Sequence, residues 1–214
     1  MIKAIIFDFD GVLVESTEIK TEAFKQIFQN YPAYIDEIVE YHEENMGISR
    51  FIKFKHIYNN IIHLPISQEQ EEDLGKTFSQ IVLEKILSAS FASGAMEFLQ
   101  EYYKDYFMFV ASGTPEEELH FIIKNRGIEE YFIETHGTPR KKPEIINDIL
   151  KRYHWNPQEA IFVGDAETDL SAANETGIHF VARIAKWRNK TFDCTYCIDN
   201  LSDLVMILKK LSKY

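Results

Sequence analysis

Cysteine is scarce in this sequence, since Cys194 and Cys197 are the only two in 214 residues. A disulfide framework needs more cysteines than this, so the count favours a reducing compartment and two thiols. A structural zinc site needs four ligands, and the chain offers no second Cys-x-x-Cys pair. A thioredoxin-like redox site would begin a helix, whereas residues 193–198 have the composition of a strand. Neither zinc nor redox chemistry is expected here.

Long apolar runs and an excess of positive charge are also missing. Residues 57–68 form the longest stretch without a charged side chain, and this stretch is too short and too polar to span a membrane. Asp8 interrupts the apolar N-terminal run and no small-residue cleavage site follows, so we expect a cytoplasmic protein. The formal net charge of −11 repels nucleic-acid phosphates and anionic lipids. Neither a nucleic acid nor a membrane is expected as a partner.

The first half of the chain combines one strand with a block of helices. Residues 2–9 form an unbroken β-branched and aromatic run, which is typical of a fully buried strand. Residues 15–87 show helical spacing and no convincing strand, and the last of their helices begins with a capping box of Ser67 and Gln70. Helices are expected at 18–28, 35–44, 49–59 and 67–87.

The second half of the chain alternates strands with helices, which predicts an α/β fold. Strands are expected at 107–111, around Phe132, and at 160–163, 179–183 and 194–198, and helices at 94–103, 115–126, 143–153, 169–176 and 201–211. Such alternation indicates a Rossmann-like parallel sheet with helices on both faces. Because the sheet also needs the first strand, we expect an α/β core of residues 1–14 and 88–214. Residues 15–87 then form an all-helical insertion after the first strand.

Polar residues follow three of the predicted strands at the point where each strand ends. They are Asp8 and Asp10 after the first strand, Ser112 and Gly113 after the second, and Asp165 and Asp169 after the strand at 160–163. Ligands of an open parallel sheet bind beyond the carboxyl ends of its strands, so these side chains are expected to meet in one crevice. Clustered carboxylates are costly unless a cation compensates them, and ligands that are all oxygen suit Mg²⁺.

Phosphoryl transfer accounts for the two aspartates of the first strand. A carboxylate at Asp8 can attack phosphorus and form an acyl-phosphate. Asp10 is two residues further along an extended chain and therefore on the same side, where it can protonate the leaving oxygen. Gly11 permits the sharp turn that must follow.

The other strand ends supply groups that bind a phosphate. Ser112 can hydrogen-bond a phosphoryl oxygen, and residues 114–117 indicate a capping box whose helix N-terminus would be an anion site. Lys142, at the start of a predicted helix, can neutralise the transferring group and the crowded carboxylates. These residues predict a small phosphorylated molecule as the substrate.

The order of these motifs resembles the haloacid-dehalogenase superfamily. The run Asp8-Phe9-Asp10-Gly11-Val12-Leu13 is similar to its first motif, Ser112 to the second, Lys142 to the third, and Gly164-Asp165 with Asp169 to the fourth. The resemblance looks closest to the β-phosphoglucomutase and phosphoglycolate-phosphatase branch, and residues 15–87 stand where that superfamily has a helical cap.

The resemblance implies an enzyme, a phosphatase with Asp8 as nucleophile, Asp10 as general acid and base, and Lys142 in the catalytic site. It also implies that Mg²⁺ is held by the Asp8 carboxylate, the Asp10 main-chain carbonyl and Asp165. Asp169 would be a further or water-mediated ligand. Ser112 and Gly113 would then contact the phosphoryl group.

Substrate choice is expected to depend on the helical insertion, which would close over the crevice. Arg50 could reach a second anionic group of the substrate, and Lys20 lies shortly after Asp10, although each could instead be a surface cation on an amphipathic helix. A phosphomutase is the alternative to a phosphatase, and a non-enzymatic sensor or scaffold is a remote third. By the resemblance, mutases of the β-phosphoglucomutase type carry a histidine where this chain has Lys20, which favours hydrolysis.

Overall fold

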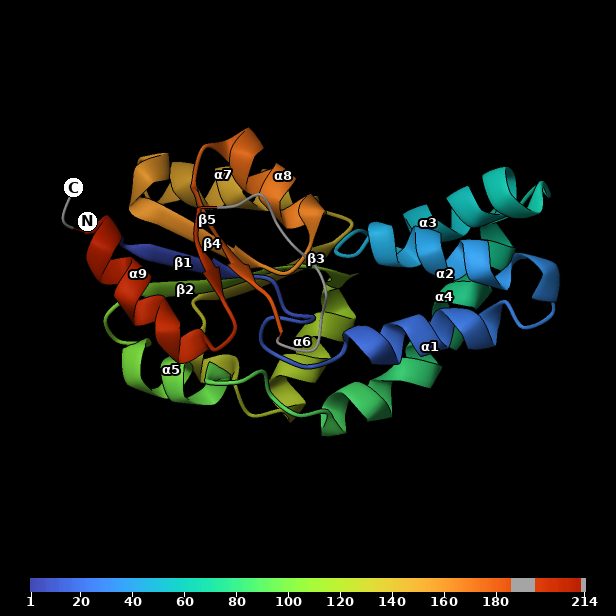
Figure 1. Ribbon diagram of the computed structural model, residues 1–214, viewed down its shortest axis with the longest axis horizontal. Helices are drawn as coiled ribbons and strands as arrows, with labels where there is room; N and C mark the ends of the chain where they lie inside the picture. The colour runs from blue at the N-terminus through green and yellow to red at the C-terminus, as the bar shows by residue number, and fades with distance from the viewer. Residues whose placement is uncertain (186–194, 213–214) are drawn as a thin grey trace.

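A parallel sheet forms the frame of the protein, whose computed structural model describes residues 1–185 and 195–212 (Figure 1). Within these residues the sheet has six strands in the order β3-β2-β1-β4-β5-β6. The strands are β1 (Ala4–Phe7), β2 (Phe107–Pro115), β3 (Glu134–Thr138), β4 (Ala160–Gly164), β5 (His179–Arg183) and β6 (Cys197–Ile198). Every neighbouring pair is parallel, so the predicted α/β fold is confirmed.

Helices cover both faces of this sheet. One face carries α7 (Lys142–Arg152) and α8 (Glu167–Thr176), and the other carries α5 (Ala95–Tyr102), α6 (Glu116–Asn125) and α9 (Leu204–Leu211) (Figure 1). Alternate residues of β1 point to opposite faces. Ala4 and Ile6 belong to the apolar cluster under α7 and α8, whereas Ile5 and Phe7 belong to the opposite cluster. Burial on both faces explains why the strand reads as a continuous apolar run.

Four helices lie beyond the carboxyl ends of the strands (Figure 1). They are α1 (Thr17–Ile27), α2 (Ile35–Glu44), α3 (Arg50–His56), which a π-helical segment (Ile57–Ile62) continues, and α4 (Gln68–Ser88). Aromatic rings form the centre of this block, with ring centroids 5.2 Å apart for Phe24 and Phe78 and 5.7 Å apart for Phe24 and Phe54. The predicted capping box of Ser67 and Gln70 is confirmed at the start of α4.

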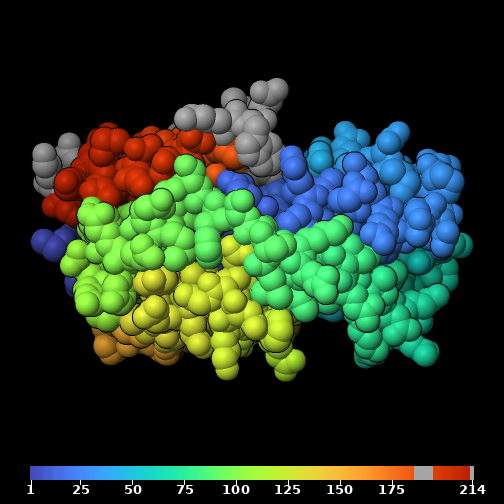
Figure 2. All heavy atoms as spheres, turned by 90° about the horizontal axis from the view of Figure 1, so that it is seen from below, coloured from blue at the N-terminus to red at the C-terminus, as the bar shows by residue number. Residues whose placement is uncertain are grey.

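The helical block is joined to the sheet by more than the chain itself. Figure 2 shows the blue-to-green residues of the block packed directly against the rest of the protein. Arg50 of α3 and Ser79 of α4 both contact Glu118 of α6. No helix among the described residues is both long and apolar enough to cross a bilayer.

Two local expectations from the sequence are wrong, and a third is shifted by two residues. The short strand expected near Phe132 is present as β3 but begins at Glu134, after a 3₁₀ turn (Glu129–Tyr131) and the Phe132 ring, which packs against Phe7 with 6.4 Å between centroids. The capping box predicted at Thr114 is absent, since β2 continues to Pro115 and α6 begins at Glu116 without a side-chain cap.

The second wrong expectation concerns the cysteines. Cys197 lies in β6 and is disulfide-bonded, so it is no free thiol. Cys194 lies outside the described residues. The expectation of free thiols depends on the rarity of disulfides in reducing compartments. It does not take the positions of the cysteines in the fold into account.

Candidate active site

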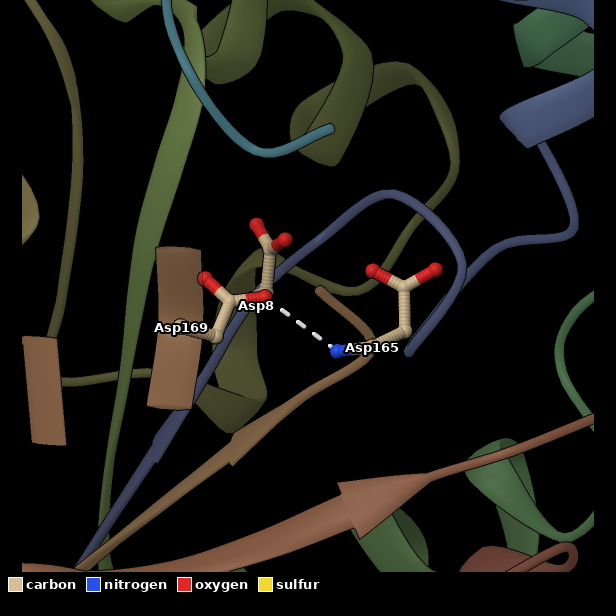
Figure 3. A group of neighbouring side chains, drawn as sticks. All are labelled: Asp8, Asp165 and Asp169. Atoms are coloured by element: carbon tan, nitrogen blue, oxygen red, sulfur yellow. Dashed lines mark hydrogen bonds between the residues drawn. The ribbon is translucent and has the colours of Figure 1, made fainter. Parts of the chain in front are cut away.

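Three buried carboxylates meet at the carboxyl edge of the sheet (Figure 3). Asp8 follows β1 and Asp165 follows β4, its parallel neighbour, while Asp169 lies in the first turn of α8. Each residue offers a carboxylate oxygen, and these oxygens lie within 4.8 Å of one another. A cluster of this kind, buried and made of oxygen ligands only, could hold a metal ion.

Asp8 is the carboxylate at the centre of this arrangement. Burial raises its pKa to about 7 against the opposing charge of Lys142, and the charges of Asp169 and Asp10 add to the increase. The Phe9 amide donates a 2.7 Å hydrogen bond to Asp8 Oδ1. Asp8 Oδ2 lies 3.0 Å from the Nζ atom of Lys142.

Lys142 is the basic residue that the fold brings to the cluster. It begins α7, and its Nζ atom lies 2.5 Å from Asp169 Oδ1 as well as 3.0 Å from Asp8 Oδ2. Burial alone would lower the pKa of Lys142, but the charges of Asp169 and Asp8 raise it well above its ordinary value. Of its two basic neighbours, Lys141 is exposed and Arg140 pairs with Asp148. Lys142 is therefore a fixed cation between two carboxylates.

Asp169 has both of its carboxylate oxygens engaged within the protein. Its Oδ1 atom contacts Lys142, and its Oδ2 atom accepts hydrogen bonds of 3.2 Å from the amides of Asp165 and Ala166 (Figure 3). The same carboxylate thus shapes the turn between β4 and α8 and orients Lys142. Asp169 therefore has a structural task in addition to its place among the three carboxylates that could hold a metal ion.

Asp10 has a separate set of partners. Its Oδ1 atom accepts a 2.6 Å hydrogen bond from Ser16 Oγ, and its Oδ2 atom accepts bonds from Lys20 Nζ and, at 3.0 Å, from Thr114 Oγ1. Burial raises the pKa of Asp10, but the charge of Lys20 and the three hydrogen bonds outweigh burial and hold that pKa below its usual value. Lys20 also contacts Thr114 Oγ1 at 2.9 Å. Lys20 is therefore not a surface cation.

The turn after Asp10 requires a glycine. Gly11 has a φ of +75°, and a Cβ atom added there would lie 2.2 Å from Asp165 Oδ2. The carbonyl oxygen of Gly11 accepts a 2.9 Å hydrogen bond from the buried Arg183, which also pairs with Glu15. Asp165, a candidate metal ligand, therefore packs against one side of the turn. Arg183 of β5 holds the other side through its hydrogen bond.

We expect Gly11→Ala to reduce activity far more than it reduces stability. A left-handed residue other than glycine costs about 1–2 kcal/mol, and the new methyl group must also displace Asp165. A shift of that kind can cost about 100-fold in rate. Gly127→Ala is the matched control, because Gly127 has a φ of +67° with nothing within 4 Å of an added Cβ atom. Thermal unfolding and turnover of both variants test this, and equal activity in the two would contradict the role given to the turn.

Ser112 and Gly113 lie where β2 meets the helical block. Ser112 is buried, and its Oγ atom accepts a 3.1 Å hydrogen bond from the amide of Thr114. A Cβ atom on Gly113 would lie 2.6 Å from the carbonyl oxygen of Gly47, in the loop before α3. Thr168 Oγ1 donates a 2.6 Å hydrogen bond to the carbonyl oxygen of Met46 in the same loop. The helical block therefore packs against the strand ends through the main chain of the loop before α3.

Arg50 lies inside the interface between the helical block and the sheet layer. Its Nη1 and Nη2 atoms lie 3.0 and 2.6 Å from the two carboxylate oxygens of Glu118, and its guanidinium carbon is 4.4 Å from the Phe78 ring centroid. Of the two alternatives for Arg50, the surface cation is excluded, because the side chain is 4% exposed. Its charge is balanced by Glu118.

A cavity of about 50 Å³ lies between the carboxylates and the helical block. Asp8, Asp10 and Asp165 line it from the sheet, and α1 to α4 supply Lys20, Phe24, His42, Lys53 and Phe78 from the other side. By the same measure one water needs roughly 10–15 Å³, so the cavity has room for a group of only a few atoms.

Several of these residues escape analysis of the sequence alone. Thr114 carries a visible signal, since it stands two residues after Ser112 and so on the same side of an extended chain, but the residues that follow it predict a helix cap instead. Ser16 and Lys53 carry no such signal. They reach the site only through the packing of the helical block.

Comparisons with known proteins agree with this geometry. The family model described as haloacid dehalogenase-like hydrolase matches residues 5–183. A phosphorylated carbohydrates phosphatase from Thermotoga maritima is 25% identical over 82% of this chain and 82% of its own length. Phosphoglycolate phosphatase 1 from Pseudomonas aeruginosa is 23% identical over 95% of this chain and 78% of its own. The structure of β-phosphoglucomutase from Clostridium difficile matches with a TM-score of 0.80 at 20% identity, over 100% of this chain and 99% of that one, which shows a shared fold.

Proposed function

The chain belongs to the haloacid dehalogenase-like hydrolase family, and we propose that it is a cytoplasmic, Mg²⁺-dependent phosphatase of small phosphate monoesters. One observation carries the proposal. A buried carboxylate, Asp8, lies 3.0 Å from the fixed cation Lys142 and lines a small cavity at the carboxyl edge of the sheet. Nucleophilic attack by such a carboxylate forms an aspartyl-phosphate.

The first step transfers the phosphoryl group to Asp8. The Asp8 carboxylate attacks phosphorus, and the bond from phosphorus to the ester oxygen breaks. Asp10 lies on the same wall of the cavity, and in its protonated form it donates its proton to the leaving oxygen and becomes a carboxylate. Lys142 stabilises the negative charge on the phosphoryl oxygens, and Ser112 and Gly113 contact them from the end of β2.

The second step hydrolyses the aspartyl-phosphate. Asp10 accepts a proton from a water molecule, which attacks phosphorus and releases phosphate and the Asp8 carboxylate. The hydrogen bonds from Lys20, Ser16 and Thr114 favour the charged form of Asp10, which is the form that accepts this proton.

The residues present fit a magnesium ion. Asp8 and Asp165 would supply carboxylate oxygens, and the family pattern adds the main-chain carbonyl oxygen of Asp10. Asp169 would act through water or through its contact with Lys142. The donor set is all oxygen, and the raised pKa of Asp8 indicates that Lys142 alone does not compensate the cluster. Bound Mg²⁺ would favour the Asp8 carboxylate and neutralise charge on the phosphoryl group.

Residues 15–87 would act as the cap of this enzyme, with residues 1–14 and 88–214 as its core. The cap closes the crevice through its contacts at Gly47 and Arg50. The small volume of the cavity supports a small substrate. The phosphatases of Thermotoga and Pseudomonas, named for phosphorylated carbohydrates and phosphoglycolate, support the same class of ester.

The direct test is a panel of phosphate monoesters with Mg²⁺ and with EDTA. Free phosphate that appears only with metal supports the phosphatase. An isomerised product without free phosphate, formed only with a bisphosphate primer, would replace it with a phosphomutase. Metal binding without turnover of any ester would instead favour a non-enzymatic sensor or scaffold.

Metal binding is expected to weaken as the pH falls. Burial raises the pKa of Asp8 to about 7 in the metal-free protein, so below that pH a proton competes with the ion. The apparent affinity for Mg²⁺ should fall by up to roughly tenfold per pH unit below about pH 7 and be constant above it. Calorimetric titrations between about pH 5 and 8 measure this. Asp8→Asn protein should bind more weakly and without the pH dependence, and a flat profile in the native protein would contradict the proposed ligand.

A further inference from the structure

The cap contains a buried lysine that the reaction does not use. Lys53 of α3 is 3% exposed. Its Nζ atom lies 2.9 Å from His42 Nδ1 and 3.1 Å from the carbonyl oxygen of the same residue. Both partners are uncharged acceptors in the tautomer of His42 that leaves Nδ1 unprotonated, so these hydrogen bonds hold the ammonium group without balancing its charge.

Lys53 differs in this respect from Lys20 and Arg50, which line the same cavity, and from Lys142 beside Asp8. Lys20 pairs with Asp10, Arg50 with Glu118, and Lys142 with Asp8 and Asp169. The described part of the chain gives Lys53 no carboxylate partner within ion-pair distance.

A buried cation without a counter-charge is energetically unfavourable. Burial and the nearby charge of Lys20 lower the pKa of Lys53 to about 7, with a smaller opposing effect from Asp10. An anionic ligand would supply the missing negative charge. An ammonium group has three N–H donors, of which His42 accepts two, so one is left for such a ligand.

The position of Lys53 relates it to the reacting groups. It lines the same cavity as Asp8 and Asp10, but from the cap. A substrate whose phosphoryl group meets Asp8 therefore has its other end directed toward α2 and α3. The small volume of the cavity, about 50 Å³ in all, favours a short ester.

We propose that Lys53 binds a carboxylate of the substrate, and that the preferred substrates are short phosphate monoesters carrying one carboxylate. One unbalanced positive charge matches a compact monoanion, whereas a second phosphate is larger and carries nearly two negative charges at neutral pH. A neutral hydroxyl group would leave the charge of Lys53 unbalanced. The inference deepens the proposed phosphatase function and rests on it.

The test compares two esters of nearly equal size, 2-phosphoglycolate and 2-hydroxyethyl phosphate. The first carries a carboxylate where the second carries a hydroxymethyl group. The native protein should prefer 2-phosphoglycolate in kcat/KM. Lys53→Met should lose about 10- to 100-fold on 2-phosphoglycolate, as expected for a lost hydrogen bond between charged groups, and less than about 3-fold on the hydroxyethyl ester. Methionine keeps the apolar stem of the side chain, and thermal unfolding checks the fold.

Lys55→Met is the matched control. Lys55 lies on the same helix, its side chain is 61% exposed and it pairs with Glu71. Its loss should change neither substrate by more than about 3-fold, because an exposed ion pair is weak. Equal losses on both esters in Lys53→Met would show a structural role for Lys53 and overturn the proposal.

The outcomes also separate this proposal from the phosphatase itself. A native enzyme that hydrolyses both esters without preference refutes the role of Lys53 and leaves the phosphatase intact. If neither ester is hydrolysed, calorimetric binding of 2-phosphoglycolate to Asp8→Asn protein decides. Binding that weakens about 10-fold or more on adding Lys53→Met supports the carboxylate site, and unchanged binding overturns it.

Discussion

The Asp8→Asn protein is expected to release no phosphate from any ester that the native protein hydrolyses. An amide cannot attack phosphorus to form an acyl-phosphate, and removal of a nucleophile elsewhere has cost on the order of 10⁶ in kcat. We therefore expect a loss of at least about 10⁴-fold. Phosphate release with and without Mg²⁺ measures it, and activity within about 10-fold of native would exclude Asp8 as the nucleophile.

The fold of this variant should survive. Asp8 is buried beside Asp169 and Asp10, which raise its pKa and disfavour its charge. Asparagine has no charge to bury, and Lys142 keeps its 2.5 Å contact with Asp169. The metal-free variant should unfold at the native temperature or above it. A large loss of stability would mean that lost activity reports unfolding.

Lys142→Met is expected to have the second largest effect, on activity and on stability together. Removing the cation leaves Asp8 and Asp169 buried without compensation, which costs about 3–5 kcal/mol for a broken buried ion pair. The phosphoryl group also loses a stabilising charge, worth about 10²–10³ in kcat. The exposed Lys141 provides the control, since Lys141→Met should change neither quantity.

The stability of Lys142→Met should depend on pH in a defined direction. Without the ammonium group, burial raises the pKa of both carboxylates further above their values in the unfolded chain. Stability is then highest at low pH, where both are protonated in either state, and is lost as the pH rises through the folded pKa values. Urea unfolding of the metal-free variant at about pH 5 and 8 tests this. A variant more stable at the higher pH would contradict the assignment.

Features set by neighbouring residues could be predicted from the sequence. β1 is a continuous apolar run because both faces of the sheet are covered, and α4 begins where Ser67 and Gln70 cap it. The motif residues Asp8 and Asp165 meet because their strands are parallel neighbours. The alternation of strands and helices predicts that the strands are parallel, whereas the adjacency of β1 and β4 comes from the structure.

Features set by distant partners could not be predicted. Thr114 fits a capping box locally, yet its hydroxyl group contacts Asp10, 104 residues away. The sequence shows that Arg50 is a cation, but its partner, Glu118, is 68 residues away on another element. Lys53 depends on His42 from a different helix. In each case tertiary packing decides which polar group a side chain reaches, and periodicity carries no information about that choice.

The most direct test of this account is to trap the phosphorylated enzyme. The protein would be mixed with a ³²P-labelled ester and Mg²⁺, quenched in acid within one turnover, digested and mapped. The account predicts label on the peptide that contains Asp8, lost on treatment with hydroxylamine as an acyl-phosphate is, and absent from Asp8→Asn protein. Label that resists hydroxylamine and maps to Ser112, or phosphate release by Asp8→Asn protein at the native rate, would contradict it.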